Sequence, residues 1–436
     1  MTQVLFAFDT EDFTSPTAAA AILEEAKILE REGVKGAFNV VGLLAQQLES
    51  WGRQDIIEAL KYHELGCHSY GHTLHPMLNE YTDIEDFDAA KKEVLRQESE
   101  ALEMIAHATN GQKVYAACPP GNQKSYVGMY AYAQMGLPIY ADTFCDTPDG
   151  QGVHYCNQYH VRYTFCMEQM QQMEPAQLPA ILDELAKHHR AICYAHPNMA
   201  LYKEFWDAVN YQKVNKYPFG QWEEGARLPE QATKDFYEKI RTLVRLIKED
   251  PRFEIICYSD LARQVQQEGR RCVTTEDIPL LAQKLKENFY PVTEPVSLCL
   301  SDLFLACRQF LLGEKVHSCG HVYGFLDKPF AIEEPVTVTA SQMKTSAEKM
   351  DVSGFLPTAV LVGENTLGPG DWLRAAMAVL LGEESVTIYP GAQLPSLDAL
   401  PELRDCALKG TWMHGDDFED KYLSERLRLQ AWTMRF

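Results

Sequence analysis

Short apolar runs alternate with longer segments of helical periodicity over roughly the first 270 residues. Strands that alternate with helices are typical of an α/β domain with a parallel sheet. About seven strand–helix units favour a closed or nearly closed (β/α) barrel over an open doubly wound sheet. The apolar runs predict strands at Val4–Phe8, Val34–Val41, Leu65–Ser69, Val114–Cys118, Ile139–Phe144, Ala191–Ala195 and Glu254–Tyr258. The intervening periodicity predicts helices at Pro16–Glu32, Asp86–His107, Ala180–His189 and Thr233–Lys248.

The pattern changes after about Arg271, where a mainly helical part begins. Ser301–Glu314 and Gly370–Glu383 resemble each other at an offset of 69 residues, and each predicts a helix capped by Asp and ended by Gly. Duplication of a helical unit is the simplest account. Because 436 residues exceed what one core usually holds, we expect two domains, 1–271 and 272–436.

The sequence leaves the role of the C-terminal domain open. Leu356–Gly363, before the second copy, weakly resembles the entry segment of pseudomurein-binding-type repeats. The alternative is a helical accessory domain that packs on the barrel or forms a homo-oligomer.

Composition and charge narrow the classes of function. The net charge of −22 argues against a nucleic-acid partner, because such partners are bound by Lys and Arg. No apolar run approaches the roughly 20 residues of a membrane-spanning helix. The chain starts directly in a predicted strand, with no basic region or cleavage site, so we expect no signal peptide and a cytoplasmic location. Twelve scattered cysteines without a C-x-x-C pair fit reduced thiols.

Candidate chemistry follows three of the predicted strands, at the edge where α/β barrels place their active sites. Asp9, Glu11 and Asp12 put three carboxylates within four residues, and these repel one another unless a cation or a proton relieves them. His68 and His72 are four residues apart, so a helical turn would direct both toward one ion. Taken alone, an acidic loop or a chance histidine pair is the ordinary alternative for each segment.

The third segment is Ile192–Pro197, in which His196 follows a predicted buried strand. A histidine in this position is, by itself, more often structural than catalytic. In chain order, and with Gly33–Gly42 as the second strand, the three segments together resemble the polysaccharide deacetylase (NodB-homology) family over roughly residues 1–270. The resemblance implies a distorted (β/α) barrel and a metal-dependent hydrolase of amide C–N bonds.

The resemblance also implies a metal site. His68 and His72 would bind a divalent ion together with Glu11 or Asp12, and the sequence does not choose between the two carboxylates. Two nitrogens and one oxygen make zinc the first expectation, with cobalt, nickel, manganese or iron as alternatives. The ion would polarise the amide carbonyl and acidify the attacking water.

For catalysis, Asp9 matches the family's base and His196 its general acid. Two landmarks differ from the family. Its R-x-P-x-G motif is present as Ala117–Gly121, so the arginine that usually orients the base is absent. Asp142 and Asp146 lie in the region of an Asp–Trp landmark, with no tryptophan following closely. Both differences bear on the substrate more than on the metal.

These observations leave three functions open. The leading one is N-deacetylation of an acetylated amino sugar or polysaccharide. An allantoinase-like amidohydrolase of a small cyclic amide is the second, favoured by the cytoplasmic expectation. The third is a degenerate deacetylase that only binds carbohydrate, favoured by the missing arginine. Several aromatic residues are equally suited to stacking on a sugar or to a core, namely Tyr202, Trp206, Tyr211, Tyr217 and Trp222.

A second metal site at His317, Cys319 and His321 is a minor alternative. The sequence places no carboxylate and no further cysteine at metal-ligand spacing from these three residues.

Overall fold

The computed structural model describes the chain except for residues 121–122, 143–149, 269–270, 288–291 and 392–412. Within these described ranges the chain forms two compact units. The first contains residues 1–152, 158–266 and 405–424, and the second contains 153–157, 267–404 and 425–436. The main crossing lies close to the boundary expected at 271. Residues 153–157 belong to the second unit although the residues on both sides of them belong to the first, and the reverse holds for residues 405–424.

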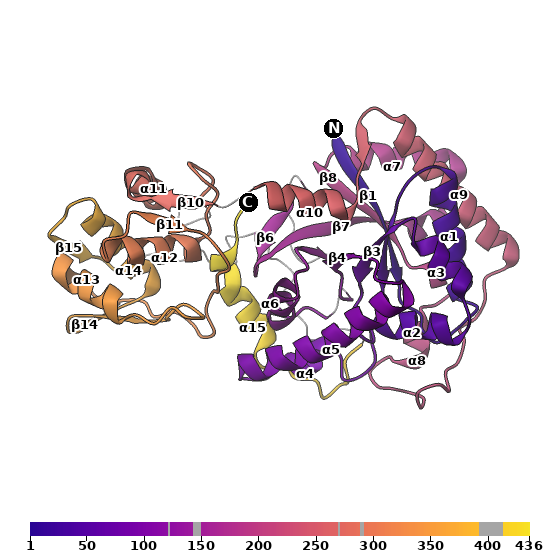
Figure 1. The fold of residues 1–436 in the computed structure, drawn as a ribbon, viewed down its shortest axis with the longest axis horizontal. Helices are drawn as coiled ribbons and strands as arrows, with labels where there is room; N and C mark the ends of the chain where they lie inside the picture. The colour runs from indigo at the N-terminus through magenta and orange to yellow at the C-terminus, as the bar shows by residue number, and fades with distance from the viewer. Residues whose placement is uncertain (121–122, 143–149, 269–270, 288–291, 392–412) are drawn as a thin grey trace. The chain divides into compact units, whose positions relative to one another are not determined.

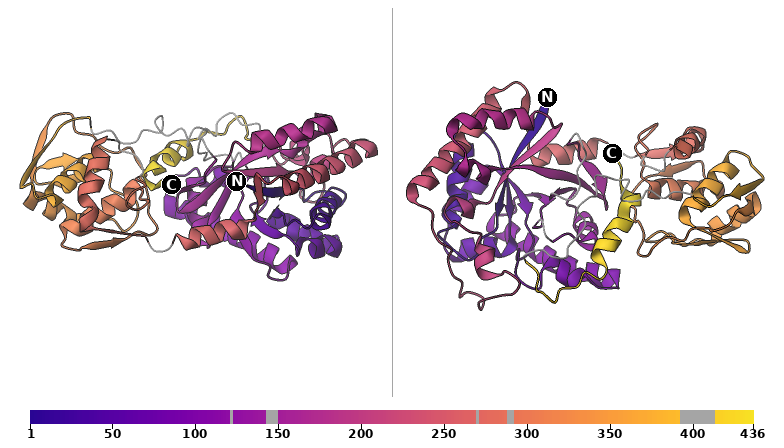
Figure 2. Two further views of the ribbon diagram at one scale, coloured as in Figure 1. Left: turned by 90° about the horizontal axis from the view of Figure 1, so that it is seen from above. Right: turned by 180° about the vertical axis from the view of Figure 1, so that it is seen from behind.

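The first unit is built on a closed parallel barrel of seven strands surrounded by helices, which confirms the predicted fold class (Figures 1 and 2). Pairing of the last strand with the first closes the barrel, and β9 (Phe253–Ile255) adds to the start of β1. In spatial order the seven strands are β1 (Thr2–Thr10), β2 (Ala37–Val40), β3 (Glu64–Cys67), β4 (Val114–Ala117), β5 (Ile139–Asp142), β7 (Gln158–Cys166) and β8 (Arg190–Ala195).

Strand β7 was not predicted, although it is as long as β1. His160, Arg162 and Thr164 interrupt its apolar run, so its sequence lacks the continuous hydrophobic pattern of a strand buried on both faces. The end of the strand predicted at Ile139–Phe144 lies outside the described residues.

The alternation of side chains along β1 determines which of them face the barrel interior at the carboxyl end of the strand. Leu5 and Ala7 on β1 belong to a buried apolar cluster with Ile139 and Ile192 from other strands. Side chains alternate between the two faces of a strand with a period of two residues. Asp9 therefore continues the face of Leu5 and Ala7, at the carboxyl end of β1.

The helices around the barrel are α1 (Ala19–Arg31), α2 (Gly42–Ser50), α3 (Gln54–Leu60), α4 (Leu78–Thr82), α5 (Phe87–Ala108), α6 (Tyr126–Gln134), α7 (Leu178–Leu185), α8 (Trp206–Asn210), α9 (Glu230–Glu249) and α10 (Tyr258–Gln267) (Figure 2). They include α1, α5, α7 and α9, which match the four predicted segments, and further helices that were not predicted. None of the helices in the described part of the chain is long and apolar enough to cross a membrane.

The second unit has its own apolar core and contains the two copies of the repeat. The copies form α12 (Leu300–Leu311) and α14 (Pro369–Leu380), and each ends before a glycine with a positive φ angle, 96° at Gly313 and 101° at Gly382. Each helix is followed by a short strand, β11 (Val316–Ser318) or β15 (Ser385–Ile388).

The repeated part is more than a helix. β10 (Cys272–Thr274) pairs antiparallel with β11, and β12 (Val336–Thr339) pairs antiparallel with β15. The prediction that an aspartate caps each helix is wrong, because both helices begin before the aspartate. The capping positions are Cys299 and Gly368, and Asp302 and Asp371 lie within the first turn. The remaining elements are α11 (Ile278–Glu287), α13 (Ala340–Lys349) and the hairpin β13 (Val360–Val362) and β14 (Asn365–Leu367).

Candidate metal and catalytic site

Glu11, His68 and His72 come together at the carboxyl ends of β1 and β3, with one donor atom from each within 4.8 Å of the others. Oε2 of Glu11 lies 2.8 Å from Nε2 of His72 and 3.4 Å from Nε2 of His68. All three side chains are buried, at 3%, 3% and 7% exposure for Glu11, His68 and His72. Two imidazole nitrogens and one carboxylate oxygen are a donor set that Zn²⁺ and similar ions accept.

The hydrogen bond made by Nδ1 of His68 determines that Nε2, the nitrogen facing Glu11, has no proton. Its Nδ1 donates to the carbonyl of Cys118, which leaves a lone pair on Nε2. This Nε2 is buried, makes no hydrogen bond and faces a carboxylate. Two electron-rich atoms facing each other in a buried site are stabilised by a cation between them. The residues therefore fit a divalent ion.

His72 is oriented in a similar way. Its Nδ1 lies 3.7 Å from Oδ2 of Asp207, an acceptor on α8, and 3.3 Å from the Thr73 hydroxyl. A proton on Nδ1 would leave the lone pair of Nε2 directed at Glu11. Burial raises the pKa of Asp207 to about 7, against the attraction of His72. Asp207 was missed by the sequence analysis, since it lies more than a hundred residues away with no motif around it.

The two histidines do not lie on a helical turn, as their spacing had suggested. They belong to the loop after β3, and Ser69 and His72 have positive φ angles of 68° and 52°. Non-glycine residues seldom adopt this conformation, and it turns the loop back so that both imidazoles reach Glu11. Backbone amides at the start of α2 bind the loop, since Gly42 and Leu43 donate to the carbonyls of Ser69 and Tyr70 at 3.0 Å each.

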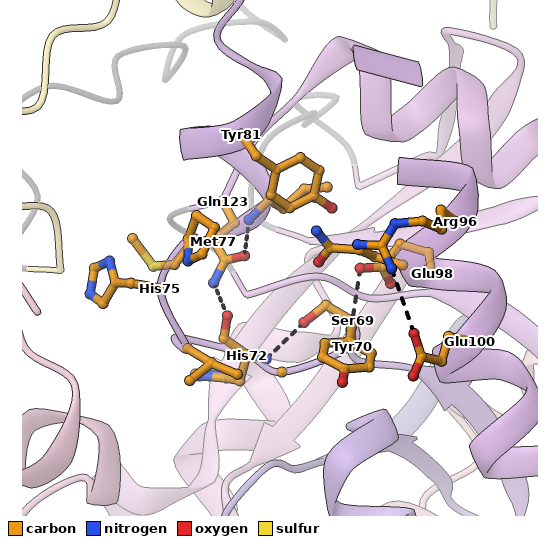
Figure 3. A pocket seen from close by; sticks show the side chains of 15 residues that line it. Ser69, Tyr70, His72, His75, Met77, Tyr81, Arg96, Glu98, Glu100 and Gln123 are labelled. Atoms are coloured by element: carbon orange, nitrogen blue, oxygen red, sulfur yellow. Dashed lines mark hydrogen bonds and ion pairs between the residues drawn. The ribbon is translucent and has the colours of Figure 1, made fainter. Parts of the chain in front are cut away.

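A cavity of about 190 Å³ is lined by residues of this loop, among them Ser69 and His72, and by residues of α5 such as Glu98 (Figure 3). Asp9, Glu11 and His196 are not among its described lining residues. Hydrogen bonds around it hold the loop: Gln123 donates to the His72 carbonyl at 2.5 Å, and the His72 amide donates to Ser69 Oγ at 3.1 Å. The hydrogen bonds beside this cavity hold the loop that carries His68 and His72.

Of the two carboxylates left open by the sequence, Glu11 lies in the group and Asp12 does not. Oδ1 of Asp12 accepts hydrogen bonds from the amide and hydroxyl of Thr14, at 2.9 and 2.6 Å, within its own turn. Glu11 is held by Trp206, whose indole N–H donates to Oε1 at 3.0 Å, so that Oε2 faces the histidines. Burial alone would raise the pKa of Glu11, but the neighbouring His72 and His196 hold it well below its ordinary value.

Asp9 is held by neutral donors. The amide of Asn39, its neighbour on β2, donates to Oδ1 at 2.7 Å, and the Tyr163 hydroxyl donates to the same oxygen at 2.8 Å. Asn39 also donates to the Tyr163 hydroxyl at 2.8 Å. Ala117, at the position of the family's arginine, is fully buried at the end of β4. Tyr163 and Asn39 thus orient Asp9 without a guanidinium group.

His196 follows β8 and faces Asp9, with Nε2 lying 3.7 Å from Oδ2 of that carboxylate. Its other nitrogen, Nδ1, lies 2.9 Å from Oε1 of Glu168, which also accepts the His196 backbone amide. Burial alone lowers the pKa of His196, but Glu168, Glu11 and Asp9 outweigh burial and raise it to about 10. Glu168, a carboxylate that the sequence analysis missed, thus holds the His196 ring in place and favours its imidazolium form.

The aromatic residues near the site divide between the two expected roles. Trp206, Tyr202 and Tyr211 are buried, at 3%, 3% and 2% exposure, and are core residues. Trp222 and Tyr217 are half-buried. Asp146 and the side chain of Asp142 lie outside the described residues.

Comparisons with known proteins give similarity at the level of structure only. No family model matches the chain, and no curated protein matches it. A Mycobacterium smegmatis protein assigned to the polysaccharide deacetylases has 14% identity and a TM-score of 0.40, covering 61% of this chain and 91% of its own. A variant of the peptidoglycan deacetylase PdaC from Bacillus subtilis has 14% identity and a TM-score of 0.33, covering 65% and 96%. A CE4 family pseudoenzyme from Bacillus anthracis has 16% identity and a TM-score of 0.34, covering 58% and 64%.

The polysaccharide deacetylases noted from the N-terminal motifs are thus found again among similar solved structures, over about the N-terminal 60% of the chain. The weak likeness of the C-terminal part to pseudomurein-binding-type repeats stays a prediction.

Proposed function

We propose that this protein is a metal-dependent hydrolase of amide C–N bonds that removes N-acetyl groups from amino sugars or their polymers. The observation that carries the proposal is the juxtaposition of two sets of side chains. Glu11, His68 and His72 offer three donor atoms within 4.8 Å, and the same strand end presents Asp9 facing His196. A divalent ion held by the first set would act as a Lewis acid on the acyl carbonyl and on water.

The protein's own residues would move the protons of this reaction. Asp9 would accept a proton from the attacking water through Oδ2, since Asn39 and Tyr163 both donate to Oδ1. Nε2 of His196 faces Asp9 and in its protonated form would donate its proton to the leaving nitrogen, which completes cleavage of the C–N bond. Glu168 on Nδ1 fixes the orientation of the ring, as a carboxylate does for a catalytic histidine.

The choice of substrate rests on the surroundings of His196. Phe205 packs edge-on against the His196 ring, with centroids 5.0 Å apart, and is half-buried. Nearer Glu11, Phe219 is 55% exposed and stacks on Phe13, which in turn packs on Trp206, the residue that donates to Glu11. Half-exposed aromatic rings beside a polar site suit a ligand with both an apolar face and polar groups, such as a sugar ring. A small cyclic amide is the alternative substrate, and a substrate panel separates the two.

The test is acetate release from N-acetylated amino-sugar oligomers by the zinc-supplied protein, with metal content measured in parallel. We expect Asp9→Asn to lower kcat by roughly 10²–10⁴-fold, because the base is lost, while bound metal is retained. His68→Ala/His72→Ala should lose turnover together with the metal bound by Glu11, His68 and His72.

Asp12→Asn is the matched control, since it changes a neighbouring carboxylate that bonds only within its own turn in the described contacts. It should retain most of the activity. Full activity of Asp9→Asn would remove Asp9 from the mechanism. Metal binding without hydrolysis of any sugar amide or cyclic amide would instead favour the carbohydrate-binding alternative.

A further inference from the structure

The second unit contains a group of metal-ligand side chains that the proposed reaction does not use. Asp302 in the first turn of α12, His317 on β11 and Cys319 directly after it each offer one donor atom, and the three atoms lie within 4.8 Å of one another. Asp302 is 0% exposed, His317 is 5% exposed, and Cys319 is half-buried. The sequence alone had shown no carboxylate near His317 and Cys319.

The fold brings the three side chains together through one short ladder and one helix. In Figure 1, β10, β11 and α12 lie side by side within this unit. The Cys319 amide donates to the Arg271 carbonyl at 2.9 Å, which continues the β10–β11 ladder beyond Ser318. His317 and Cys319 are two residues apart and so share one face of the ribbon. Asp302 meets that face from the start of α12.

Two buried atoms of this group have no hydrogen-bond partner. Nδ1 of His317 lies 2.9 Å from the side-chain oxygen of Gln309 and donates to it, which leaves a lone pair on Nε2. This Nε2 and Oδ1 of Asp302 are both buried without a hydrogen bond. Buried polar atoms are almost always paired. The Cys319 thiol lies beside Asp302 as a weak donor, but its single proton cannot satisfy both acceptors, so the cluster suits a cation.

The partners of Asp302 account for only one of its two oxygens. Oδ2 accepts from the Arg271 guanidinium at 3.1 Å and lies 3.3 Å from Sγ of Cys299. These contacts orient the carboxylate and leave Oδ1 for a further ligand. The Arg271–Asp302 ion pair by itself therefore explains Oδ2 but neither Oδ1 nor Nε2 of His317.

We propose that Asp302, His317 and Cys319 bind a second divalent ion of the zinc type. A thiolate, an imidazole and a carboxylate together select a borderline ion such as Zn²⁺ over Mg²⁺ or Ca²⁺. Cys319 binds as the thiolate, so its proton is released to solvent when the ion enters. The ion joins the start of α12 to β11 and stabilises this unit. His321 is exposed and takes no part.

The test uses the full chain carrying His68→Ala/His72→Ala, so that metal at the first site does not obscure the count. We expect about one equivalent of zinc to remain, and Cys319→Ser or His317→Gln added to this background to remove it. Cys272→Ser is the matched control, because Cys272 pairs with Ser318 and faces the opposite side of the ribbon. It should leave the zinc in place.

Cobalt substitution gives a readout that does not depend on these variants folding. The group Glu11, His68 and His72 contains no sulfur, so a thiolate-to-cobalt charge-transfer band in the unsubstituted protein reports the second site alone. We expect this band, and its loss in Cys319→Ser. A folded, cobalt-loaded protein without the band would overturn the proposal, as would an unchanged zinc content in Cys319→Ser. Neither result bears on the proposed deacetylase site.

Discussion

At the scale of single residues, the site depends on which oxygen or nitrogen each side chain presents. Trp206 holds one oxygen of Glu11 and turns the other toward the histidines, whereas Asp12 is occupied by Thr14. Asn39 and Tyr163 hold one oxygen of Asp9 and leave the other facing His196. In each case a neutral donor bonds one carboxylate oxygen, so that the other oxygen faces the site without any added charge.

The pairing of His196 with Glu168 predicts a shift in the pH dependence of the reaction. A general acid works in its protonated form, so activity falls as the pH rises through the pKa of His196. That pKa is raised to about 10 with Glu168 as the largest raising influence, after burial, which lowers it. Glu168→Gln removes this influence. We expect the alkaline limb of kcat/KM to move to lower pH by about 1–3 units.

The control for this prediction is Cys166→Ser, because Sγ of Cys166 donates to the other Glu168 oxygen at 2.7 Å and a serine hydroxyl keeps that bond. Its alkaline limb should coincide with that of the unsubstituted protein. An unshifted limb in Glu168→Gln would show that His196 is not the group whose proton is titrated.

At the scale of elements, β3 must pass close to Asn39, the side chain that orients Asp9. A Cβ added at Gly66 on β3 would lie 2.2 Å from Oδ1 of Asn39 and 3.1 Å from Sγ of Cys118. The strand therefore has room for Asn39 only because residue 66 has no side chain. Asn39 lies in the predicted second strand, where a polar residue within an apolar run was the available signal.

Gly66→Ala should consequently displace Asn39 and release Asp9 from its orientation. We expect a loss of about 1–3 kcal/mol in the free energy of unfolding from overpacking, with a fall in kcat and retention of metal. Chemical denaturation and acetate release measure these effects. Gly354→Ala, where an added Cβ meets nothing within 4 Å, should change neither. Undiminished kcat in Gly66→Ala would separate Asn39 from catalysis.

Helix α5 carries a buried carboxyl group, Glu98, next to the loop that holds His68 and His72. It accepts from the Tyr132 hydroxyl at 2.8 Å and from the Tyr70 amide at 3.2 Å. Burial raises its pKa from 4.5 to about 7, against these two bonds. The folded state thus holds this proton more tightly than the unfolded state. The contribution to stability is fully present below pH about 4.5 and is lost as the pH rises to about 7.

Glu98→Gln should remove this pH dependence, since an amide can bond both partners without charge. We expect the free energy of unfolding to change less between pH 5 and pH 8 in the variant, by on the order of 1–3 kcal/mol. Urea denaturation at the two pH values measures the difference. The exposed Glu103→Gln on the same helix is the control and should behave as the unsubstituted protein does. Equal pH dependence in Glu98→Gln would contradict the assignment.

At the scale of the whole molecule, the chain divides into two units with separate apolar cores. In the second unit, Trp372 on α14 is fully buried, packs against Phe304 at 4.6 Å between ring centroids and donates to Ser346 Oγ at 2.9 Å. This tryptophan connects the two helices of the repeat, α12 and α14.

Trp372→Ala should destabilise the second unit by about 3–5 kcal/mol, because it removes a large buried ring and leaves a cavity. Differential scanning calorimetry should show one transition moved to lower temperature and another unchanged. Acetate release at moderate temperature should be unaffected, since no atom of the proposed site lies in this unit's core. Loss of both transitions together would mean that the two cores unfold as one.

The sequence by itself determined the barrel, the two-part organisation and the short list of candidate site residues. These depend on local information: alternating apolar runs, helical periodicity, the repeat, and acidic or histidine residues directly after strands. It could not find β7, in which polar residues interrupt the apolar run, nor the true start of the repeat helices.

Only the tertiary structure showed that Glu11, and not Asp12, lies beside His68 and His72. It also brought Glu168 to His196, Tyr163 and Asn39 to Asp9, and Asp302 to His317 and Cys319. The contacts of Glu168 with His196, Tyr163 with Asp9 and Trp206 with Glu11 span 28, 154 and 195 positions. Such contacts follow from the order of strands in the closed barrel and from the turns of the loops between them. A local pattern of residues does not contain that order, because it is set by which strands pair when the whole core closes.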